Sequence, residues 1–189
     1  MDKAQATLIA ATIAAIASVA KLIFDRYSES RASHRELLQP LLAELGEAIA
    51  GVVATSTVLA KGRSDKSYSN WYGKAAKERE KLKEVRPKVR YPLWGIDEGL
   101  RVLIRLPDWV SHARADKKRL SKLLSRADGL RKMVDVVAFR CYRNGRTPDL
   151  LEILQVRFHA WRCRRVFDAG ANGCNADAQP KRARGLSTR

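Results

Sequence analysis

The 189-residue chain has few of the residues that mark several common classes of protein. Three cysteines are too few for a disulfide scaffold of this size, and six prolines with eleven glycines exclude collagen-like and low-complexity chains. Acidic residues are scarce too, because 37 lysines and arginines outnumber 20 aspartates and glutamates and leave a net charge of +17. The apolar fraction of 46% is ordinary for a chain that buries a core. We therefore expect a folded, basic protein from a reducing compartment.

Catalytic and metal-binding signatures are missing from the sequence as well. It contains no glycine-rich phosphate loop, no nucleophile elbow and no metalloprotease helix. His159 and Cys163 are four residues apart on one expected helix, a spacing that can share a metal ion. A third ligand, Cys141, would lie about 18 Å away along the helical hairpin predicted around residue 145. Both cysteines are therefore expected to be small core residues, and no catalytic residue, metal or cofactor is assigned.

One long hydrophobic run lies at the start of the chain, at residues 4–24. Of its 21 residues, eight are Leu, Ile, Val or Phe and eight are Ala, and the length matches the hydrocarbon core of a bilayer. The residues after it carry an excess of basic charge, which by the positive-inside rule keeps the C-terminal side in the cytoplasm. The sequence thus predicts a single-pass anchor in the inner membrane with a cytoplasmic C-terminus. The lipid bilayer is then the first expected partner, through residues 4–24.

Two other interpretations of this run stay open. Isoleucines spaced like the stripe of a buried helix would suit a soluble bundle, which would make the protein cytoplasmic. A secretory signal peptide could be cleaved after Ala20, although Met1-Asp2-Lys3 is less basic than the start of such peptides. A row of small residues would favour association of this helix within a membrane, so a homo-oligomer is a possible assembly. The row consists of Ala6, Ala10, Ala14 and Ser18.

The remainder of the chain is patterned as a series of helices, with no strand pattern or internal repeat. The expected fold class is all-α. A single transmembrane or buried apolar helix over 1–27 precedes an antiparallel bundle of about four or five helices over 28–169 and a disordered basic tail over 170–189. The clearest periodicity is a heptad seam, which we expect to be core, with coiled-coil pairing between chains as the alternative. The seam is Leu38, Leu42, Leu45, Ile49, Val52, Ser56 and Leu59.

Capping and breaking residues predict where these helices begin and end. Ser33 and Glu36 have the spacing of a capping box, so a helix is expected to begin near them or at Pro40. Residues 62–73 are rich in small polar residues and are expected to form a loop. Two further prolines are expected to end or break helices, namely Pro87 and Pro107.

A tight helical hairpin is predicted around residue 145. Asn144-Gly145 supplies a left-handed stop, and Thr147-Pro148-Asp149 supplies an N-cap, a first-turn proline and an acid suited to the helix dipole. Apolar residues cover more than half of the circumference of the second arm, which runs to about Phe167. This arm is therefore expected to lie centrally in the core.

The positive charge is concentrated in two blocks of +7 each, residues 61–90 and 116–147. The first block mixes basic residues with Tyr68, Trp71 and Tyr72, a combination found on surfaces that bind single-stranded nucleic acid. In the second, basic residues four apart share one helical face. The alternative to binding anionic lipid or nucleic acid is a solvated surface with aromatic anchors. The candidate polyanion-binding residues are Lys74, Lys77, Arg79, Lys118, Lys122, Arg126 and Trp71.

These patterns favour a non-enzymatic, membrane-anchored helical protein whose basic cytoplasmic bundle acts as an adaptor, scaffold or effector module. One rival hypothesis is a soluble, basic nucleic-acid-binding bundle whose apolar first helix belongs to the core or to a dimer seam. Another is a membrane-permeabilising effector in which the small-residue helix oligomerises. No protein partner is indicated.

Overall fold

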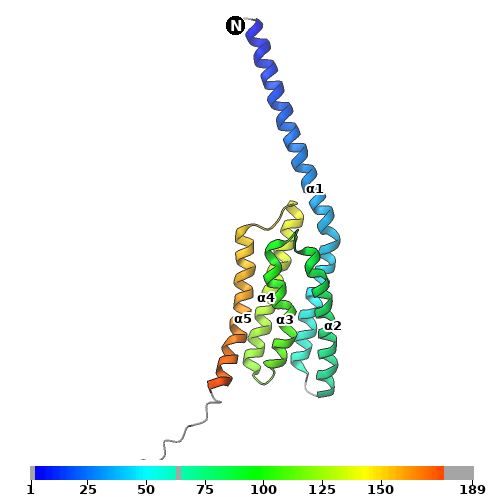
Figure 1. The fold of residues 1–189 in the computed structure, drawn as a ribbon, viewed down its shortest axis with the longest axis vertical. Helices are drawn as coiled ribbons and strands as arrows, with labels where there is room; N and C mark the ends of the chain where they lie inside the picture. Colours follow the sequence, from blue (N-terminus) through cyan, green and yellow to red (C-terminus); the bar gives the residue numbers. More distant parts are fainter. Residues whose placement is uncertain (1–2, 63–64, 177–189) are drawn as a thin grey trace, which may run out of the picture.

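The computed structural model describes residues 3–62 and 65–176, with the side chains of 16–62 and 66–169. Within these residues the chain is all-α, as predicted, and contains no strand. The helices run alternately down and up, so sequential helices are antiparallel (Figure 1). They are α1 (Lys3–Lys61), α2 (Asp65–Val89), α3 (Asp97–His112), α4 (Lys117–Asn144) and α5 (Leu150–Ala176), with the short 3-10 turn η1 (Trp94–Ile96) before α3.

The first helix is a single element of 59 residues, not two. The expected start near Ser33 or Pro40 is wrong, because both residues lie inside α1, and residue 27 is not a boundary between helices. A proline costs one backbone bond, and here the packing of the surrounding helix offsets that loss. The N-terminal half of α1 projects beyond the bundle (Figure 1), and the side chains of 16–30 are exposed. Leu38 is the first fully buried side chain along the described part of α1.

The heptad seam faces the interior of the bundle, as predicted. Its leucines, isoleucine and valine are buried apart from the half-buried Leu42. Because α2, α3 and α4 of the same chain pack against α1, this seam is used within one molecule and gives no support to coiled-coil pairing between chains.

Ser56 interrupts this seam with a hydroxyl that is fully buried and has no hydrogen-bond partner. An unpaired buried hydroxyl destabilises the folded state, and alanine is a better helix former than serine. We expect Ser56→Ala to raise the free energy of unfolding by about 1 kcal/mol. Urea denaturation followed by circular dichroism measures this change. A lower unfolding free energy in the variant would show instead that the hydroxyl is satisfied in solution.

The central helix of the bundle is α3, not α5 as the sequence predicted. α3 packs against α1, α2, α4 and α5, and nine of its 16 residues are buried. α5 lies at one edge and contacts mainly α4 and α3 (Figure 1). Its apolar residues divide between a buried face, with Ile153, Val156 and Ala160, and an exposed face. The exposed face consists of Leu150, Leu151, Leu154, Phe158 and Trp161.

Three expected breaks fall in different places. The segment expected to be a loop over 62–73 is helical from Asp65, so Tyr68, Trp71 and Tyr72 lie on α2. Pro87 and Pro107 lie inside α2 and α3. The chain breaks instead after His112, and a carboxylate oxygen of Asp116 accepts a hydrogen bond from the backbone N–H of Arg119 at 3.0 Å to cap α4.

The hairpin between α4 and α5 is confirmed, although its second cap is different. Gly145 has φ of 60°, the left-handed stop that the sequence predicted. A Cβ there would lie 2.7 Å from the carbonyl oxygen of Arg31, so the turn rests directly on α1. Thr147 does not begin the second helix, which starts at Leu150. Residues 170–176, expected to belong to a disordered tail, continue α5, and the rest of that tail lies outside the described residues.

Candidate polyanion-binding groove

A groove of about 600 Å³ lies between the beginning of α4 and the end of α5. Because α4 starts and α5 ends at the end of the bundle opposite the projecting part of α1, the groove is at that far end (Figure 1). Its lining contains six cationic side chains and one carboxylate. The lining residues are Asp116, Lys118, Arg119, Lys122, Arg126, Trp161, Arg162, Arg165, Val166 and Ala169.

Three of the predicted candidate residues meet in this groove. Lys118, Lys122 and Arg126 follow one another at four-residue spacing along α4, and all three line it. No ion pair in the described part of the chain involves any of them. This side of the groove thus presents cations that a bound anion could contact without breaking an existing pair.

The other side of the groove was missed from the sequence. α5 contributes Arg162 and Arg165, and the guanidinium of Arg165 lies 5.2 Å from the ring centre of Trp161. Arg162 lies 5.4 Å from the ring centre of Phe158 in the same way. The available signal was the basic cluster at 162–165, but the segment 148–169 carries a net charge of only +1, which concealed it.

Arg119 holds the two helices of the groove together. Its guanidinium donates hydrogen bonds to the backbone carbonyls of Val166, at 3.3 Å, and of Phe167. The same group lies over the Phe167 ring, which stacks on the buried Trp109 of α3 with 4.9 Å between ring centres. Arg119 therefore has a structural role and is less available to a ligand than the other five cations.

The charges of Arg126 and Arg162 affect the pKa values of His159 and Cys163. Burial lowers the pKa of His159, and the charges of Arg162 and Arg126 lower it further. Burial also raises the pKa of Cys163 to about 11 and that of Cys141 to about 11. Both cysteines are buried core residues, as predicted. Among the described residues, no three of His, Cys, Asp and Glu are grouped to hold a metal.

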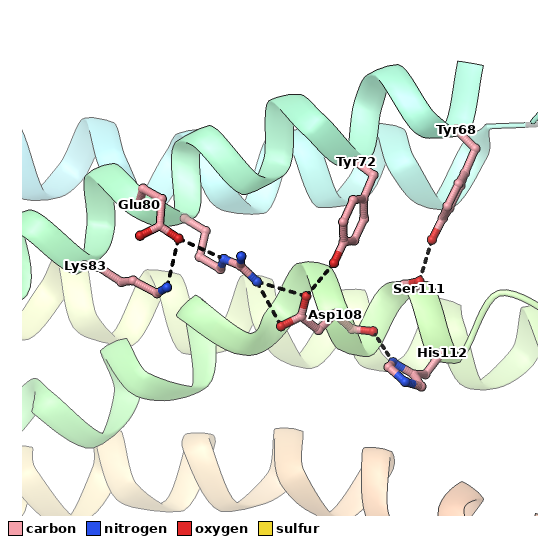
Figure 2. Close-up of polar contacts among 8 residues, drawn as sticks. Tyr68, Tyr72, Glu80, Lys83, Asp108, Ser111 and His112 are labelled. Carbon is pink, nitrogen blue, oxygen red and sulfur yellow. Dashed lines mark hydrogen bonds and ion pairs between the residues drawn. The ribbon is translucent and has the colours of Figure 1, made fainter. Parts of the chain in front are cut away.

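The candidate residues of α2 lie elsewhere and are partly engaged. The guanidinium of Arg79 donates to both carboxylate oxygens of Asp108 at 3.0 Å, and the Tyr72 hydroxyl donates to Asp108 at 2.9 Å. Figure 2 shows Tyr72 pointing to Asp108 and Tyr68 pointing to Ser111, so these contacts join α2 to α3. The hydrogen bond to Asp108 raises the pKa of Tyr72.

Two more α2 candidates interact with each other. The Lys74 ammonium lies 4.3 Å from the ring centre of Trp71, which is half-buried against the core. Trp71 thus anchors α2 to the core, while Lys74 and Lys77 remain exposed. The structure places the three candidate cations of α4 beside the cations of α5 and leaves those of α2 as a separate surface.

Comparisons of the chain with protein-family models, with curated proteins and with solved structures find no match. The groove offers cations and an aromatic ring, which suit binding of an anion.

Proposed function

We propose that the protein is a membrane-anchored, non-enzymatic adaptor, scaffold or effector module, inserted in the inner membrane with its bundle in the cytoplasm. The observation that carries this proposal is the continuity of α1. One helix supplies both a core element of the bundle and a projecting apolar half (Figure 1). By length and composition α1 qualifies as a membrane span within Ile16–Lys61, where 33% of the qualifying window is buried in the bundle, so the anchor at residues 4–24 is inferred from their sequence and their projection.

The dimensions of α1 support this arrangement. Residues 4–24 would cover about 31 Å, close to the hydrocarbon thickness of a bilayer. The large apolar side chains described in this run are exposed, as a lipid-facing helix requires. A polar stalk of about 20 Å, residues 25–37, then separates the run from Leu38. Because the stalk is helical, it would hold the bundle at a fixed distance from the membrane.

The proposal predicts that two charged substitutions together in the projecting half release the protein from membranes. Placing aspartate at Ile16 and Val19 costs about 3 kcal/mol per residue near the centre of a span, which exceeds the few kcal/mol that favour insertion. We expect the full-length Ile16→Asp/Val19→Asp protein to move to the soluble fraction in an alkaline carbonate wash, whereas the wild type stays in the pellet. The bundle should remain folded, because both side chains are exposed and lie outside it.

The matched control is Ser30→Asp/Ser33→Asp, which adds the same charge on the exposed stalk and should leave the protein in the pellet. Wild-type protein that is soluble and monomeric without detergent would disprove the proposed anchoring. Soluble wild-type protein that is oligomeric would favour the rival hypothesis, in which the apolar half forms a seam between chains. Leakage of dye from vesicles on insertion would favour the permeabilising effector.

A further inference from the structure

We propose that the α4–α5 groove binds single-stranded nucleic acid, with phosphates on Lys118, Lys122, Arg126 and Arg162 and a base stacked on Trp161. This site adds a ligand class to the proposed function. The site rests on that function in one respect only, namely that the groove lies too far from the anchoring bilayer to bind its lipids. The binding measurements do not require the protein to be anchored.

The groove is too far from the membrane to serve the lipids of the bilayer in which α1 is proposed to lie. The α4–α5 turn rests on α1 at Arg31, about 10 Å beyond Phe24 along the helix. Lys122 lies 22 residues before the end of α4, which adds about 33 Å. The sum of these two distances is several times the Debye length of about 8 Å, so the charge of the lipid headgroups would be screened at the groove. A ligand must therefore come from solution.

The charges of the groove suit a chain of phosphates. Cations from two helices face one space, and none of the six pairs with a carboxylate among the described residues. By contrast, the neighbouring arginines Arg157 and Arg164 pair with Glu98 of α3, at 3.5 and 3.0 Å, and are held away from a ligand. Asp116 places one negative charge at the start of α4. Phosphates are thus favoured at the Lys122 and Arg126 side of the groove.

The aromatic ring distinguishes nucleic acid from other polyanions. Trp161 is 50% exposed at the groove, and Phe158 stacks beside it with 5.9 Å between ring centres. Each ring has an arginine guanidinium over it. Nucleobases stack on aromatic rings and on guanidinium planes, whereas an acidic peptide has no group that requires such a surface. A duplex buries its bases, so the ring would contribute only to a single strand.

The test uses full-length protein in a non-ionic detergent and a fluorescent oligothymidylate, measured by anisotropy. We expect binding that weakens about 50-fold between 50 and 200 mM salt, as four phosphate contacts on a single strand require. Lys118→Glu/Lys122→Glu should weaken binding about 20-fold or more. Trp161→Ala should weaken it about tenfold, and Trp161→Phe should restore most of the loss because the ring is kept. All these side chains are exposed, and circular dichroism checks that the helices are retained.

The matched control is Lys61→Glu/Lys66→Glu, which makes the same charge change on two exposed lysines that are not candidate binding residues and do not line the groove. Its binding should fall far less than that of the groove variant, and an equal fall would overturn the assignment of the site.

Absence of binding at 50 mM salt would also overturn the proposal. The proposal would likewise be overturned by two results together. Polyglutamate, duplex or anionic vesicles would bind as tightly as the oligothymidylate, and Trp161→Ala would not weaken binding. Thymidine monophosphate should compete only weakly, and competition at oligonucleotide affinity would overturn a strand as the ligand.

Discussion

Replacing Leu103 with alanine is expected to lower the free energy of unfolding by about 3 kcal/mol. Leu103 is 0% exposed and lies on α3, the helix that packs against α1, α2, α4 and α5. Removing its side chain leaves a cavity in the core that the surrounding side chains close only in part, so the cost is expected within the range known for buried leucines. Urea denaturation of the full-length protein in a non-ionic detergent, followed by circular dichroism, measures the change.

The matched control is Leu151→Ala on α5. Leu151 is 73% exposed, so the same substitution should change the free energy of unfolding by less than about 0.5 kcal/mol. Equal losses for the two variants would contradict the peripheral position of α5. They would show that its outer face is covered in solution.

The helices themselves were largely predictable from the sequence. Each helix turns one face to the core of the bundle, and this leaves a periodic pattern of apolar residues in the sequence. The seam of α1 and the Gly145 stop follow from local rules, and both are observed. Helix ends marked by proline were not predictable in this way. Pro40, Pro87 and Pro107 all lie within helices, and the helix continues past each despite the loss of one backbone bond, although of the three only Pro107 is buried.

The position of each helix in the bundle depends on partners that are distant in the sequence. The short α3 is the central helix because four other helices pack against it. A more apolar pattern than that of α5 is not the reason. Apolar residues over more than half of the circumference of α5 indicated a central position, yet the structure covers only one of its faces. Periodicity therefore identified a helix but not the number of its neighbours.

The candidate site shows the same division. The spacing of Lys118, Lys122 and Arg126 on one helical face was readable, because it depends on a single helix. Their meeting with Arg162 depends on the antiparallel pairing of α4 with α5, which places the start of one helix beside the end of the other. The engagement of Arg79 by Asp108, 29 residues away, was likewise invisible to local rules.

Replacing Glu152 with glutamine is expected to lower the free energy of unfolding by about 2–3 kcal/mol at pH 7. This carboxylate is 5% exposed at the start of α5. It accepts hydrogen bonds from the Asp149 backbone N–H at 3.0 Å and from the Arg146 guanidinium at 3.1 Å. Glutamine keeps the shape and one acceptor but removes the buried one of the two carboxylate charges that Arg146 contacts. Arg146 would then keep only the exposed carboxylate of Asp149, at 2.8 Å, as its charged partner.

The effect should depend on pH in a defined direction. Burial alone would raise the pKa of Glu152, but the Asp149 N–H and the Arg146 charge outweigh burial and lower it. A carboxylate whose pKa is lowered by folding stabilises the protein above the pKa of the unfolded chain, about 4.3, and loses that contribution as the pH falls through the folded value. The difference between wild type and Glu152→Gln should thus be full at pH 7 and shrink below about pH 4.

Denaturation in urea at several pH values between 7 and 3 measures this difference. The control is Glu84→Gln, which makes the same charge change at an exposed residue for which no ion pair occurs among the described side chains. Its unfolding free energy should match that of the wild type across the whole range, because an exposed surface side chain contributes little to stability. If Glu152→Gln lowers the free energy of unfolding by the same amount at every pH, the shape of this side chain and not its charge accounts for its role. Since the turn also rests on α1 at Arg31, a loss of stability that disappears with acid would identify Glu152 as a charge that fixes the α4–α5 turn beside α1.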